Sequence, residues 1–164
     1  MSRRRRIEEG AVAGIIGAST VAVWFLVVDL VRGEPLYTPA LLGDAVFSVL
    51  KIHASEAVWP VLAYTVIHYA AFMLVGVFAV MVVEASNKSP ALLAGLFLLF
   101  AVFEVGFYFL CWILAMLTVV GQLAWYQILA ANFLASLTMG TFLWVRHPEA
   151  VPRLDAALKG TTGR

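Results

Sequence analysis

The chain has 164 residues, of which 63% are hydrophobic and 13% charged, and its mean hydropathy is +0.94. A chain of this composition has too few polar side chains to cover a compact core in water, which excludes a soluble globular protein. The net charge of +1 says little by itself, and a single cysteine, Cys111, excludes an intramolecular disulfide. The four arginines at positions 3–6 adjoin the first apolar run, where such a cluster more often anchors the topology on anionic headgroups than binds nucleic acid. We therefore expect a membrane protein.

Four apolar runs are long enough to cross a bilayer, which takes roughly 20 helical residues because hydrocarbon offers no hydrogen-bond partner to the backbone. They predict transmembrane helices at about 10–31, 58–83, 91–119 and 123–145. The breaks between the last three runs are short, so these helices should be successive antiparallel neighbours. The expected fold is an all-α membrane protein, a four-transmembrane-helix antiparallel bundle forming a single integral membrane domain over 1–164.

The segment 33–57 is the longest connection between the predicted helices. Its middle, 39–53, is largely apolar but contains Asp44 and Lys51, and it is too short to span the bilayer. Such a pattern favours a helix that lies at the membrane surface. We expect a short interfacial helix in this first outer loop, either on the surface or folded over the mouth of the bundle.

The positions of the basic residues predict the orientation, because Lys and Arg near membrane spans tend to stay on the cytoplasmic side. Nine of the eleven lie on one side of the predicted spans, together with both termini, and only Arg32 and Lys51 lie on the other. The first apolar run is also too long for a cleaved secretory signal. We expect a bacterial inner membrane protein with a cytoplasmic N-terminus and a cytoplasmic tail, 146–164.

Small residues and one pair of charges mark the first predicted helix. The small residues are spaced for close contact between helix backbones, inside the bundle or in a homodimer. They are Gly10, Gly14, Gly17 and Ala18. At its outer end, Asp29 and Arg32 are spaced i,i+3 and predict an interfacial ion pair.

Three polar residues are predicted to lie at similar depths within the bilayer. Glu104 lies near the middle of the third run, where a carboxylate costs roughly 2.5 to 3.5 kcal/mol on insertion and should face protein or water. From the rise of a helix, His68 lies roughly 13 Å and Asn132 roughly 10 Å below the outer boundary. We expect these three side chains to form a buried polar cluster. One helical turn away from them, on the same faces, lie Thr65, Tyr108 and Ser136.

This predicted cluster has two interpretations. In the first, its hydrogen bonds fix the packing of the helices. In the second, His68 and Glu104 bind or pass a proton, because buried ionisable groups in a membrane often mark transport paths. Two such ligands are too few for a closed metal site, and one buried imidazole is too few for bis-histidine haem ligation. We expect no metal and no cofactor.

The topology resembles that of small multidrug-resistance exporters, four-helix proteins that act as dimers around a membrane-embedded glutamate. In this chain, however, the acid lies in the third helix and not the first, so no family is assigned. The sequence favours a non-enzymatic accessory or scaffold subunit, and the alternative is a proton-coupled small-solute carrier or channel using Glu104 and His68. A third hypothesis, a lipid-modifying enzyme, would rely on Tyr37, His53 and Glu56. The expected partners are the lipid bilayer and either other membrane subunits or a second copy, with no nucleic acid.

Overall fold

A computed structural model describes residues 2–52, 56, 58–85, 125–148 and 152. The regular structure in these residues is entirely helical. The helices are α1 (Arg3–Val31), α2 (Tyr37–Leu50), α3 (Val58–Ala85) and α5 (Trp125–Arg146). Three of them, α1, α3 and α5, are long and apolar enough to cross a membrane. They agree with three of the four predicted spans, and the fourth, 91–119, lies outside the described residues.

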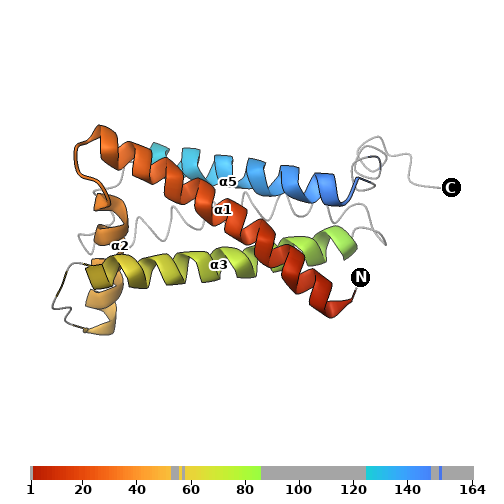
Figure 1. Cartoon of the computed structure of the whole chain (residues 1–164), viewed down its shortest axis with the longest axis horizontal. Helices are drawn as coiled ribbons and strands as arrows, with labels where there is room; N and C mark the ends of the chain where they lie inside the picture. The colour runs from red at the N-terminus through yellow and green to blue at the C-terminus, as the bar shows by residue number, and fades with distance from the viewer. Residues whose placement is uncertain (1, 53–55, 57, 86–124, 149–151, 153–164) are drawn as a thin grey trace.

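The long helices pack around α1, which runs in the opposite direction to both α3 and α5 and contacts each of them (Figure 1). The start of α1 lies at the same end of the molecule as the ends of α3 and α5. At the opposite end, α2 lies across the long helices and packs mainly against α3. The membrane-spanning part therefore has a charged end, where α1 begins, and an end that is capped by α2.

The helix α1 begins seven residues earlier than the apolar pattern predicted, at Arg3 and not at 10. Ser2 caps it, since its hydroxyl accepts a hydrogen bond of 3.4 Å from the backbone N–H of Arg5. One turn later, Arg4 and Glu8 form an i,i+4 ion pair of 2.7 Å. These local contacts continue the helix by about 10 Å beyond the apolar run.

The core follows one stripe of α1, in which buried residues recur every three or four positions from Gly10 to Asp29. Near α2, Val21 and Phe25 of this stripe pack with α5. Near the charged end, Ala13 packs in a second cluster with residues of both α3 and α5. Thus α1 contributes to both halves of the core.

The short helix expected in the outer loop is confirmed as α2, although it starts and ends earlier than 39–53. It ends because Lys51 adopts the left-handed conformation, with φ of 56°. The N–H of Lys51 then bonds to the carbonyl of Ser48 at 3.2 Å, and that of Ile52 bonds to the carbonyl of Phe47 at 2.9 Å. This is the Schellman arrangement that terminates many helices.

Candidate functional site

Glycines allow α1 and α3 to cross at very short range. A Cβ atom on Gly10 would lie 2.6 Å from the amide nitrogen of Val77, and one on Gly14 would lie 2.5 Å from the Cα of Met73. From α3, a Cβ on Gly76 would lie 2.7 Å from the amide nitrogen of Gly14. Real Cβ atoms do not approach other atoms so closely, so the crossing requires glycine at all three positions.

Gly17 and Ala18 extend the same surface of α1 towards α2. Gly17 is buried, and a Cβ atom there would meet the side chains of Met139 on α5 and Phe72 on α3. Ala18 is fully buried, and its carbonyl oxygen is the hydrogen-bond partner of His68. The four small residues predicted to mediate packing therefore lie on a face of α1 that α3 and α5 cover. A homodimer would have to form through another surface.

His68 is directed from α3 towards α1. Its Nε2 lies 3.2 Å from the carbonyl oxygen of Ala18, and because a carbonyl only accepts, Nε2 carries the hydrogen and donates it. The rings of Tyr64, Tyr69 and Phe72 surround the imidazole, with centroid separations of 5.5, 5.8 and 4.8 Å. The imidazole is thus held in place by one hydrogen bond and three aromatic contacts.

Two neighbouring hydroxyls on α1 form hydrogen bonds with two different helices. Ser19 lies 3.0 Å from the hydroxyl of Tyr69 on α3, and Thr20 lies 3.0 Å from the hydroxyl of Thr138 on α5. Consecutive residues of a helix point about 100° apart, so adjacent side chains can reach opposite neighbours. Each threonine hydroxyl also lies within reach of a carbonyl of its own helix, Thr20 of Ile16 at 2.9 Å and Thr138 of Ala135 at 3.0 Å. Because a hydroxyl has one hydrogen, one of the two threonines donates to the other, and the second donates to its own helix. These hydrogen bonds fix the rotation of α1 relative to both neighbours.

A cavity of about 390 Å³ lies beside His68, between α1, α2 and α3. Its volume is within the range of small-molecule sites, roughly 300 to 1,000 Å³. Apolar side chains form most of the wall, and Val21, Phe25 and Leu36 are among them. The described polar residues of the lining are Ser19, Asp29, Thr38, Tyr64, Thr65, His68 and Tyr69. Such a lining suits a molecule that is mainly apolar with one or two polar groups.

Asp29 closes the end of this cavity nearest α2. Its carboxylate is fully buried and accepts two hydrogen bonds of 2.8 Å from Thr38, one from the backbone N–H and one from the hydroxyl. Thr38 lies in the first turn of α2, so Asp29 caps that helix from outside its own segment. The interfacial Asp29–Arg32 ion pair predicted from the sequence is therefore wrong: the carboxylate turns inward to α2, and Arg32 is exposed.

Comparison with protein-family models, curated proteins and solved structures finds no match to this chain. The function must therefore be inferred from the chain's own residues. Within the described ranges, no three His, Cys, Asp or Glu side chains gather closely enough to hold a metal ion. The polar groups around the cavity are hydroxyls, one imidazole and one carboxylate, and several of them bond to a neighbouring helix.

The residues of the predicted polar cluster come from several parts of the chain. Thr65 lies one turn from His68 on the cavity wall and donates to the carbonyl of its own helix residue Val61 at 2.7 Å. On α5, the hydroxyl of Ser136 donates to the carbonyl of Asn132 at 2.8 Å. Glu104 and Tyr108 lie outside the described residues. The described hydrogen bond of His68 is to Ala18 on α1. The expected contact of His68 with Glu104 and Asn132 stays a prediction.

Neither the pair of Asp29 and Thr38 nor the partner of Tyr69 was predicted from the sequence. The sequence does carry a signal for a helix start at Thr38, which precedes Pro39 at the beginning of an apolar segment. The i,i+3 spacing of Asp29 and Arg32, however, favours a local ion pair over a contact with that helix. No sequence signal identified Tyr69 as the partner of Ser19.

Proposed function

We propose that this chain is a small multi-pass protein of the bacterial inner membrane, with both termini in the cytoplasm, that serves as a non-enzymatic accessory or scaffold subunit. In this role the predicted cluster of His68, Glu104 and Asn132 stabilises the packing of the helices. The protein forms one membrane domain with four spans, and α2 lies at the outer surface.

The observation that carries this proposal is where the polar side chains of the spans make their hydrogen bonds. His68 bonds to the backbone of α1, Ser19 to α3 through Tyr69, and Thr20 to α5 through Thr138. Hydrogen bonds of this kind replace the hydrophobic drive that lipid does not provide between helices. A catalytic or transport group would instead need donors or acceptors left available to a ligand.

Reconstitution of the full-length protein in liposomes with an imposed pH gradient tests the proposal. A scaffold should leave proton flux at the level of protein-free liposomes, and Glu104→Gln should leave both the flux and the fold unchanged, because an amide can still form hydrogen bonds. Flux above the protein-free level that Glu104→Gln removes would refute it. Reporter fusions at the C-terminus test the orientation separately.

The cavity beside His68 favours a second candidate, a proton-coupled carrier or channel for a small solute. About 390 Å³ is enough for a small molecule, and His68, Tyr64 and Tyr69 give its wall groups that can bind a polar substituent. Here Glu104 would take up the proton, and His68 would adjust the affinity of Glu104 for it. The outer loop with α2 would control access to the cavity.

Substituting a residue of the cavity wall separates the two candidates. Leu26→Trp would fill part of the cavity without removing any of the hydrogen bonds between helices, and Leu26 is a half-exposed residue outside the core clusters. A carrier should lose solute-dependent flux in this variant, whereas a scaffold should keep its stability and its association with other subunits. Leu129→Trp is the matched control, because Leu129 is an exposed residue of α5 that does not line the cavity.

A further inference from the structure

The charged end of the molecule contains three acidic side chains in the described residues of α1 and α3, and each has a basic side chain as its partner. The pairs are Arg4 with Glu8 at 2.7 Å, His147 with Glu9 at 2.6 Å, and Arg6 with Glu84. These contacts connect α1 to α3 and α1 to the residue that follows α5. The acidic groups here are therefore already engaged by neighbouring side chains.

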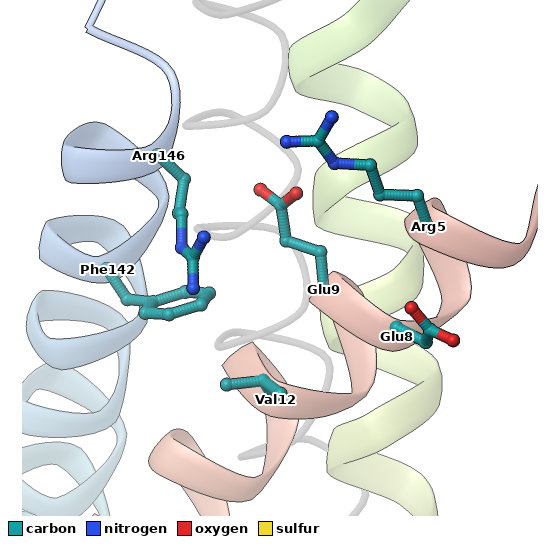
Figure 2. A pocket seen from close by; sticks show the side chains of 6 residues that line it. All are labelled: Arg5, Glu8, Glu9, Val12, Phe142 and Arg146. Atoms are coloured by element: carbon teal, nitrogen blue, oxygen red, sulfur yellow. The ribbon is translucent and has the colours of Figure 1, made fainter. Parts of the chain in front are cut away.

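Among the arginines of this end that stay outside these pairs, two lie on different helices. Within the part of the chain that the structure describes, neither Arg5 on α1 nor Arg146 on α5 forms an ion pair with an acidic side chain. Both line a hollow of about 210 Å³ between the two helices. Figure 2 shows their guanidinium groups on either side of the Glu9 carboxylate. The hollow thus brings together two cations from helices far apart in the sequence.

The position of Arg146 suits it to bind an oxyanion. Its guanidinium carbon lies 5.5 Å from the centroid of the Phe142 ring, a cation–π contact that holds the group in place (Figure 2). A guanidinium has five N–H donors, and a contact with one ring leaves most of them able to donate. Those N–H groups match the oxygens of a phosphate in a two-pronged contact.

The hollow lies at the border of the membrane-spanning region and has an apolar part as well as a charged part. Val12 and Phe142 form the apolar part, at the point where the apolar runs of α1 and α5 give way to charged residues. Glu8 and Glu9, which pair with Arg4 and His147, complete the lining. Trp144, an exposed aromatic of the kind found at headgroup level, lies in the same turn of α5 as Arg146. A ligand here would have its charged group beside the arginines and its apolar part along the helices.

We propose that this hollow is a binding site for the phosphate of an anionic phospholipid, held between Arg5 and Arg146 with an acyl chain against Val12 and Phe142. Basic side chains in pockets between transmembrane helices are a common means of holding a lipid headgroup. Glu8 and Glu9 line the same space and oppose the bound phosphate, so the site favours a singly charged phosphodiester over a doubly charged monoester. This inference does not depend on the scaffold role or on the cavity beside His68.

Native mass spectrometry of the full-length protein with added phosphatidylglycerol tests the site. Arg146→Gln and Arg5→Gln should each weaken phosphatidylglycerol binding roughly tenfold, the loss expected when a contact of about 1.4 kcal/mol is removed. Glu9→Gln removes one of the opposing charges and should strengthen binding, provided that the variant keeps the helical circular dichroism of the wild type. An unchanged affinity in Arg146→Gln, or a weaker one in a folded Glu9→Gln, overturns the proposal.

Arg3→Gln is the matched control, because Arg3 is an exposed arginine of the same helix that does not line the hollow. It removes the same charge, and at high salt, where diffuse attraction is screened, it should leave the affinity within about twofold of wild type. If Arg3→Gln weakens binding as much as Arg146→Gln does, the attraction is diffuse and no site exists. Equal binding of phosphatidylcholine, which is zwitterionic, or displacement of the lipid by inorganic phosphate alone, also contradicts a site for an anionic phospholipid.

Discussion

The crossing of α1 and α3 makes a strong prediction for Gly76→Ala. A Cβ atom at this position would lie 2.7 Å from the amide nitrogen of Gly14 and closer still to the carbonyl oxygen of Gly10. Ordinary contacts of a Cβ atom start near 3.4 Å. The two helices must therefore separate by about an ångström, which forfeits a quarter to a half of each dispersion contact across the crossing.

The expected magnitude follows from two opposing effects. Forcing a methyl group into a packed interface typically costs about 1 to 3 kcal/mol, and backbone atoms, which cannot rotate aside, place this site at the upper end. Alanine is favoured over glycine within a helix by about 1 kcal/mol, which offsets part of the cost. Gly76→Ala should therefore lower the free energy of unfolding by about 2 kcal/mol.

Gly140 on α5 is the matched control, since a Cβ atom there would have no atom within 4 Å. Gly140→Ala should leave stability unchanged or raise it by up to about 1 kcal/mol through helix propensity alone. The assay is reversible unfolding of each variant in mixed micelles, followed by circular dichroism as the share of denaturing detergent rises. If Gly76→Ala is as stable as Gly140→Ala, the close contact between α1 and α3 is not present in the folded protein.

Three further predictions concern the end of the molecule near α2 and the hydrogen bonds between helices, and the same unfolding assay tests them. Asp29→Ala should cost about 3 kcal/mol, since it leaves two buried donors of Thr38 without an acceptor, whereas Asp29→Asn should cost clearly less because its amide oxygen still accepts one hydrogen bond. Lys51→Gly should stabilise the protein by about 1 kcal/mol by relieving the left-handed backbone of a non-glycine residue, and an equal or lower stability would argue against that conformation. A double-mutant cycle of Ser19→Ala and Tyr69→Phe should give a coupling of about 0.6 kcal/mol, and zero coupling would mean that the two hydroxyls do not meet.

The spans could be predicted from the sequence because bilayer thickness and backbone hydrogen bonding alone require long apolar helices. The ends of the helices were harder to predict, since they depend on polar contacts that hydropathy does not report. The Ser2 cap and the Arg4–Glu8 pair extend α1 past its apolar run, and the left-handed Lys51 ends α2 before 53. The cap and the ion pair are local contacts that follow from residue type and spacing. A lysine, in contrast, gives no sequence signal for a left-handed residue, a position that glycine or asparagine usually occupies.

For the candidate site, the sequence predicts only how deep each residue lies in the bilayer. The rise of a helix places His68 along the membrane normal, but its direction around the axis depends on which neighbour packs against that face. In the structure this neighbour is α1, where Ala18 lets the imidazole approach the backbone. Likewise, Asp29 and Thr38 are nine residues apart, and only the turn between α1 and α2 brings them together.

The contact of Asp29 with Thr38 also limits how the cavity beside His68 can open. Moving α2 away from α1 would separate the buried carboxylate from both of its donors, and no cation in the described part of the chain forms an ion pair with it in their place. The movement therefore becomes favourable only if water or a polar group of a ligand replaces those two hydrogen bonds. For this reason, a solute entering past α2 would have to carry donors of its own, and a purely apolar one would have to enter between α1 and α3 from the lipid.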